Sequence, residues 1–125
     1  MAPPTPLAIA TQAVNRLVKE EAYYHKEQAN QERRIKKLEE DIETNSSDLD
    51  SNAGYILKQE KTALEETKAV FEPLRKRIVD AVQKLEEQVA ISESDGTGSE
   101  EDLKKAKEAL EAGQKVTKEE EEQEI

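Results

Sequence analysis

The sequence predicts an all-α protein, an antiparallel three-helix bundle with two long helices and a short third one. Residues 7–43 contain no Gly and no Pro, and apolar residues recur there at alternating steps of three and four. The chain is rich in Ala, Glu, Lys, Leu and Gln, which favour helix. No segment shows the alternating β-branched residues that a strand needs.

The first helix is expected over residues 6–43, after a flexible lead at residues 1–5. Thr5 can cap its N-terminus, and Pro6 suits the first helical position, where no backbone donor is needed. Its apolar spacing is a heptad seam, which keeps one stripe of a helix against a partner helix. The predicted seam consists of Leu7, Ala10, Val14, Leu17, Glu21, Tyr24, Gln28, Gln31, Ile35, Leu38 and Ile42.

The second helix is expected over residues 48–90, after a link at residues 44–52 that is rich in Ser, Asn and Asp. Pro73 lies inside it, but the helical pattern resumes at Leu74, so we expect a bend and not a stop. Its predicted seam consists of Ala53, Leu57, Glu60, Leu64, Thr67, Phe71, Leu74, Ile78, Ala81, Leu85 and Gln88.

A third, short helix is expected over residues 100–112. It follows a loop at residues 91–99, Ser99 can cap it, and Gly113 is expected to end it. Residues 114–125 are acidic and are expected to form a disordered tail. The bundle would thus occupy residues 6–113, with antiparallel neighbours because the links are short.

The composition disfavours several classes of function. The formal net charge of −10 disfavours nucleic-acid binding, which needs a basic face. The chain has no Cys, so it can form neither a disulfide nor a zinc finger. No apolar run is long enough to span a membrane, and the first residues lack the pattern of a signal peptide, so we expect a cytoplasmic protein.

No catalytic or metal-binding motif is found. His25 is the single histidine, and Ala22 stands three residues before it, where a di-iron bundle would have Glu. No Gly-rich phosphate loop and no HExxH motif is present. The sequence therefore predicts a protein that is not an enzyme and needs no cofactor or metal.

The middle of the first helix has a polar seam, from Glu21 to Gln31. Either the bundle is loosely packed there, with polar residues setting the register, or the outer surface near Tyr23 is a docking face. The basic cluster of Arg33, Arg34, Lys36 and Lys37 has two interpretations as well: surface ion pairs, or contact with an acidic partner.

The run AVNRLVKEEAYYHKEQANQERRIKKLEED, residues 13–41, resembles the first helix of the tubulin-folding cofactor A family. The LEETK run at residues 64–68, with a proline shortly after it, and the short Ala-rich last helix at residues 99–113 are also similar to that family. The resemblance covers residues 7–112. The chain departs from the family pattern in its proline, which comes about one residue later, and in its longer acidic tail.

The resemblance implies a bundle that binds β-tubulin released from the cytosolic chaperonin and holds it until the α/β heterodimer assembles, without nucleotide or metal. It also implies contact with other tubulin-folding cofactors and a location at the microtubule cytoskeleton. The candidate contact residues are Arg16, Lys19, Tyr23, Tyr24, His25, Lys26, Glu27, Arg33 and Lys37. The alternative is a coiled-coil adaptor or a trafficking-bundle protein. Both a monomer and a homodimer are compatible with the pattern.

Overall fold

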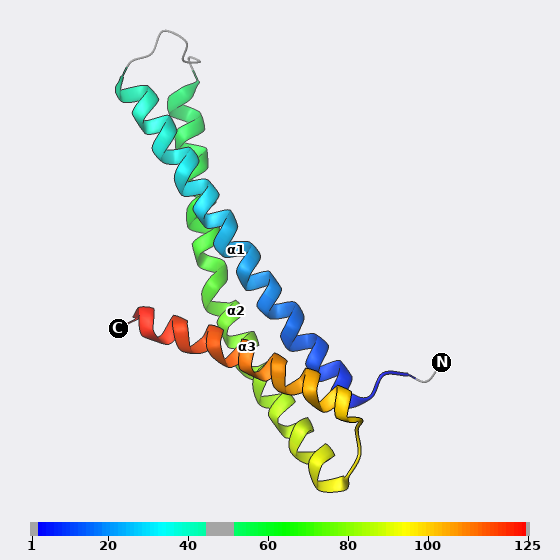
Figure 1. The fold of residues 1–125 in the computed structure, drawn as a ribbon. Coiled ribbons are helices and arrows are strands. Elements are labelled where there is room, and N and C mark those ends of the chain that lie inside the picture. Colours follow the sequence, from blue (N-terminus) through cyan, green and yellow to red (C-terminus); the bar gives the residue numbers. More distant parts are fainter. Residues whose placement is uncertain (1–2, 45–51, 125) are drawn as a thin grey trace. The chain divides into compact units, whose positions relative to one another are not determined.

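Three α-helices make up the part of the chain that the computed structural model describes, residues 3–44 and 52–124 (Figure 1). Helix α1 spans Pro6–Glu43, α2 spans Ala53–Asp95 and α3 spans Glu100–Glu124. No residue in the described ranges is in a β-strand. The predicted all-α, three-helix architecture is therefore confirmed. Across the same ranges, no helix combines the length and the apolar character needed to cross a bilayer.

The chain folds into two compact units. The first, here called the three-helix unit, consists of Met1–Glu21 and Glu72–Ile125 and contains parts of all three helices. The second, the two-helix unit, is Ala22–Phe71 and contains the C-terminal half of α1 and the N-terminal half of α2. Because each unit has its own interior, the two are described separately.

Helix α1 has the boundaries and the buried face that its heptad pattern predicts. The Thr5 side-chain oxygen accepts a hydrogen bond from the backbone N–H of Ala8 at 3.1 Å, so Thr5 caps the helix. Every residue of the predicted seam, from Leu7 to Ile42, is buried or partly buried. The alternation of three and four therefore identified the correct face of this helix.

The interior of the three-helix unit is mainly apolar, although Thr11, Glu21 and Ser92 are buried in it as well. Val14 of α1 and both Ile78 and Leu85 of α2 are completely buried. Ala106 and Ala109 of α3 are buried as well, and their small side chains let the third helix approach closely. Burial of one large aliphatic side chain contributes about 1.5–3 kcal/mol, so these contacts dominate the stability of the unit.

Gly113 lies where α3 approaches both other helices closely. A Cβ atom at this position would lie 2.6 Å from Cγ2 of Val82 and 3.1 Å from Cγ1 of Val14, so only glycine fits without movement. The prediction that Gly113 ends the third helix was wrong, because α3 continues to Glu124. The expected disordered tail is helical up to that residue, in keeping with the Lys, Glu and Gln residues that follow the glycine.

The connection between α2 and α3 is shorter than predicted. We expected a loop at residues 91–99, but α2 extends to Asp95. Ser92 is buried, so the inward face of α2 extends about one turn beyond Val89, the last buried apolar residue of that helix. Gly96 and Gly98 then turn the chain with φ values of 66° and 86°, a backbone conformation that other residues rarely adopt.

Helix α3 runs antiparallel to α2 (Figure 1). Ser99 caps it as predicted, because its side-chain oxygen accepts a hydrogen bond at 3.0 Å from a backbone N–H of the first turn. The Lys107 ammonium lies 3.0 Å from a Glu93 carboxylate oxygen, and the Gln114 amide donates to Glu86 at 3.2 Å. The later residue of α3 thus contacts the earlier residue of α2, as antiparallel helices require.

The two-helix unit has a thin and partly polar interior. Ile35 and Ala53 are its buried apolar residues, and Gln31 and Thr67 are buried beside them. The Thr67 hydroxyl donates to the carbonyl oxygen of Ala63 at 3.1 Å, within its own helix. The remaining apolar residues at seam positions are only partly buried: Leu38, Ile42, Leu57, Leu64 and Phe71.

Helix α2 continues through Pro73, as the pattern predicts, and Leu74 directly after it is buried. The bend expected at this proline stays a prediction. The helix begins at Ala53 in the described chain, so the expected start over residues 48–51 lies outside the described residues. Its last five residues, 91–95, fall in the predicted loop.

Candidate functional site

The nine predicted contact residues all lie on α1, in two groups. Arg16 and Lys19 belong to the three-helix unit, and the other seven belong to the two-helix unit. Tyr24, in the seam, and Glu27, beside it, are partly buried. The remaining residues are exposed: Arg16, Lys19, Tyr23, His25, Lys26, Arg33 and Lys37. Their role as partner contacts stays a prediction, and their placement on α1 decides which of them a partner can reach.

In the two-helix unit, four of these residues share the face of α1 opposite the seam. Tyr23, Lys26, Arg33 and Lys37 follow one another at steps of three, seven and four, which are neighbouring positions on one side of a helix. All four are exposed. The helix therefore presents one aromatic and three basic side chains in a row to solvent.

The two adjacent tyrosines contact each other edge to face. The ring centroids of Tyr23 and Tyr24 are 5.3 Å apart, and the ring planes are inclined by 76°. Tyr24 lies in the seam, whereas the Tyr23 side chain lies outside it and Tyr23 is 60% exposed. The partly buried ring thus supports the exposed one and limits the conformations it can adopt.

His25 contacts the partner helix of its own unit. Its imidazole ring stacks on the Phe71 ring of α2, with centroids 4.5 Å apart and planes inclined by 27°. The stack covers one side of a partly buried aromatic ring at the edge of the seam. This geometry gives His25 a packing role within the unit, in addition to the partner contact predicted for it.

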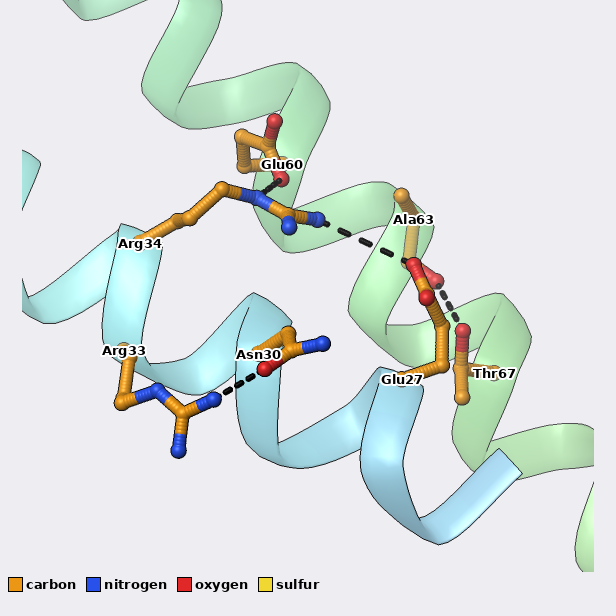
Figure 2. A network of polar contacts seen from close by, with 7 residues as sticks. All are labelled: Glu27, Asn30, Arg33, Arg34, Glu60, Ala63 and Thr67. Atoms are coloured by element: carbon orange, nitrogen blue, oxygen red, sulfur yellow. Dashed lines mark hydrogen bonds and ion pairs between the residues drawn. The ribbon is translucent and has the colours of Figure 1, made fainter. Parts of the chain in front are cut away.

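Glu27 takes part in an ion-pair bridge between the two helices (Figure 2). The Arg34 guanidinium lies between two carboxylates, 3.8 Å from Glu27 of α1 and 3.5 Å from Glu60 of α2. A second pair joins Lys61 of α2 to Glu39 of α1 at 3.4 Å. All of these side chains are at least 30% exposed, so each pair contributes at most about 1 kcal/mol. Sequence reasoning did not pair Arg34 with Glu60 or Lys61 with Glu39, because the two members of each pair lie on different helices.

Unlike Arg34, the basic residues on the outward side of α1 have no carboxylate partner in the part of the chain that the structure describes. The Arg33 guanidinium donates to the side-chain oxygen of Asn30, a neutral group on the same helix (Figure 2). Within the described residues, no ion pair or hydrogen bond joins the side chains of Lys26 or Lys37 to another group. Their charges are therefore available to a partner.

The three-helix unit carries a groove that sequence reasoning missed. It has a volume of about 770 Å³ and lies between α1 and α2, with Ala10, Leu17 and Ala81 among its lining residues. Ile9 also lines it and is 55% exposed, although it is a large apolar residue. Arg16, one of the predicted contact residues, belongs to this groove. The signal that could have found it is Ile9, which lies outside the heptad seam.

The arrangement suits binding by surface contact. Among residues 3–44 and 52–124, no group of three or more His, Cys, Asp or Glu side chains could hold a metal ion. The features that the structure assembles on α1 are instead a supported aromatic ring, a row of basic side chains and a groove with apolar residues. Such features occur at protein–protein interfaces.

Comparisons with known proteins agree with this description. The family model described as tubulin binding cofactor A matches residues 2–110. The protein named tubulin-specific chaperone A of Saccharomyces cerevisiae (strain ATCC 204508 / S288c) is 32% identical over 113 residues, which cover 90% of this chain and 94% of that protein. No solved structure gives a significant match. The chain belongs to the tubulin binding cofactor A family.

Proposed function

We propose that this protein is a tubulin chaperone that binds β-tubulin after its release from the cytosolic chaperonin and holds it until the α/β heterodimer assembles. Membership of the tubulin binding cofactor A family and the name of the yeast relative support a role with tubulin. The restriction to β-tubulin rests on the sequence resemblance. The protein would act in the cytoplasm, at the microtubule cytoskeleton and together with other tubulin-folding cofactors.

The observation that carries the proposal is the division of α1 into two faces. One face is buried against the protein's own helices along its whole seam, and the opposite face exposes Tyr23 and several basic side chains. A surface that is already formed binds a partner with little loss of conformational entropy. The proposed action is therefore binding by mass action, without nucleotide, metal or catalysis.

The buried seam also disfavours the alternative of a coiled-coil adaptor. An adaptor that pairs with other proteins through its heptad seam needs that seam free. Here Leu7, Val14, Leu17 and Ile35 are each at most 7% exposed, because the chain's own helices cover them. A partner therefore has to use the outward face or the groove.

Capture of β-tubulin by the immobilised protein tests the proposal, with β-tubulin synthesised in a lysate that contains the chaperonin. The wild type is expected to retain β-tubulin, and Tyr23→Ala is expected to retain at least about fivefold less, because exposed aromatic anchors carry much of the affinity of an interface. Tyr55→Ala is the matched control, since Tyr55 is 63% exposed and lies on α2 of the same unit. It should bind like the wild type.

Two results would contradict the proposal in different ways. If the wild type retains no more β-tubulin than resin alone, the function is wrong. If Tyr23→Ala and Tyr55→Ala bind equally well, the function stands but the contact surface is not the outward face of α1.

A further inference from the structure

Over residues 22–37, the charges on α1 are segregated, and Glu40 ends this pattern on the same side of the helix. The side of the helix that faces away from the seam carries four basic residues between positions 22 and 37 and no acidic residue. We call these four the α1 basic face: Lys26, Arg33, Lys36 and Lys37. The acidic residues of the same stretch, Glu27 and Glu32, lie at the flanks of the seam instead. Segregation of this kind leaves a continuous positive strip along one side of the helix.

The fold itself does not neutralise this strip. Three other basic side chains of the unit have carboxylate partners, whereas Lys58 has none in the described ranges: Arg34 pairs with Glu60, Lys61 with Glu39 and Lys68 with Glu65. In the described part of the chain, by contrast, no carboxylate lies within ion-pair distance of any residue of the α1 basic face. Arg33 with Lys36 and Arg33 with Lys37 are spaced as like-charge neighbours, which repel on a helix, whereas Glu40 is at attractive spacing from Lys36 and Lys37 without forming an ion pair with either.

We propose that the α1 basic face binds an extended acidic peptide segment, rich in Glu and Asp, of a partner protein. Binding would offset the repulsion of Arg33 by Lys36 and Lys37 and give all four cations charge-assisted contacts to carboxylates. The inference rests on the proposed function, because it assigns a chemistry to the client segment that meets this part of α1. It includes Lys36, which the sequence analysis named in the basic cluster but not among the nine candidate contact residues.

The dimensions of the strip agree with an extended peptide. Eleven residues of helix separate Lys26 from Lys37, a rise of about 16 Å. About five residues of extended chain cover that length, and every second side chain points the same way at intervals of about 6.6 Å. Carboxylates on alternate residues could therefore reach successive cations along the face.

A protein segment fits the surroundings better than nucleic acid does. The whole chain has a formal net charge of −10, which repels a polyanion as long as a nucleic acid, whereas a short peptide can remain within the strip. Tyr23 lies beside Lys26 on the same side of the helix and offers contact area to a peptide. The face has no row of large apolar residues that would insert into a lipid surface.

Fluorescence anisotropy with a fluorescein-labelled octaglutamate peptide tests the inference on the full chain at low salt. The triple variant Lys26→Gln, Lys36→Gln, Lys37→Gln is expected to bind about tenfold more weakly than the wild type, given the energy of a few exposed ion pairs. The control is Lys104→Gln, Lys115→Gln, Lys118→Gln on α3, which removes the same number of charges from exposed positions. This control should bind like the wild type if the face and not the total charge is responsible.

Several results would overturn the inference. These are equal weakening of binding in both triple variants, no binding by the wild type, and tighter binding of oligothymidine or of phosphatidylserine vesicles than of octaglutamate. Nuclear magnetic resonance of the wild type gives a second measurement should the variant fail to fold. Octaglutamate should then shift the amide signals of Lys26, Arg33 and Lys36 more than those of α3, and an equal shift of both would contradict the assignment.

The test of the acidic-peptide site can fail or succeed independently of the test of the proposed function. If octaglutamate binds at the α1 basic face but β-tubulin is not captured, the proposed client is wrong and the acidic-peptide site stands. If β-tubulin is captured equally by the wild type and by the Lys26, Lys36, Lys37 variant, the client is right and the acidic-peptide site is wrong.

Discussion

Both units of this protein bury the seam of α1, but they cover it with different numbers of helices. In the three-helix unit, α3 helps to enclose a core in which Val14, Ile78 and Leu85 are completely inaccessible. In the two-helix unit no third helix contributes, and Gln31 and Thr67 occupy buried positions. Among the described residues, both units bury some polar side chains, but only the unit with a third helix encloses large apolar side chains completely.

The comparison teaches where stability and binding reside. Buried aliphatic side chains contribute more to stability than exposed ion pairs do. The two-helix unit relies on pairs such as Arg34 with Glu60, which are at least 30% exposed. We infer that the three-helix unit provides most of the folding free energy. The two-helix unit presents the tyrosine and the basic side chains proposed to bind a client.

The largest predicted effect compares a core leucine from each unit. Leu85→Ala in the three-helix unit is expected to lower the free energy of unfolding by about 3 kcal/mol, because it leaves a cavity in a fully enclosed site. Leu64→Ala in the two-helix unit is expected to cost about 1 kcal/mol, because Leu64 is only partly buried. Urea unfolding followed by circular dichroism measures both. Equal losses would show that the two interiors are equally well packed.

The second prediction contrasts two helical glycines. Gly113→Ala is expected to destabilise the protein by about 2 kcal/mol, because the new methyl group would lie 2.6 Å from Cγ2 of Val82. Gly54→Ala, in the two-helix unit, adds a methyl group with nothing within 4 Å and should stabilise the protein by about 0.5 kcal/mol. Thermal melting of both variants provides the measurement. A stabilising Gly113→Ala would mean that α3 can move away without loss.

The third prediction concerns the polar interior of the two-helix unit. The side-chain oxygen of Gln31 is buried and has no hydrogen-bond partner among the described residues. Such an acceptor loses its hydration without compensation, so Gln31→Leu is expected to raise the free energy of unfolding by about 1 kcal/mol. Gln28→Leu is the control, since the Gln28 amide donates to Glu32 at 3.0 Å and is only partly buried. If Gln31→Leu destabilises the protein, this glutamine sets the register of the pair.

The helical segments and their inward faces could largely be predicted from the sequence. The seam of α1 from Leu7 to Ile42 is buried or partly buried throughout, and Thr5 and Ser99 cap helices as expected. These features are local, because the period of the helix decides which residues share a face and a cap acts within one turn. The outward face of α1, with Tyr23 and its basic neighbours, follows from the same register.

The predictions that were wrong concern features that depend on contacts with distant parts of the chain. Gly113 was expected to end a helix, since glycine is common just past helix ends. Its actual role, to let α3 pack against Val14 and Val82, depends on residues far away in the sequence. The extension of α2 to Asp95 was missed for a similar reason, because Ser92 is polar and yet buried in the fold.

The sequence by itself determined that the chain is helical, that its described part forms three helices, and which side of the two long helices faces inward. Only the tertiary structure decided that the large apolar side chains that are completely buried lie in the three-helix unit, that His25 stacks on Phe71, and that Arg34 bridges Glu27 and Glu60. The physical reason is one of range. Periodicity and capping act between residues a few positions apart, whereas packing and ion pairing depend on which side chains two folded segments bring together.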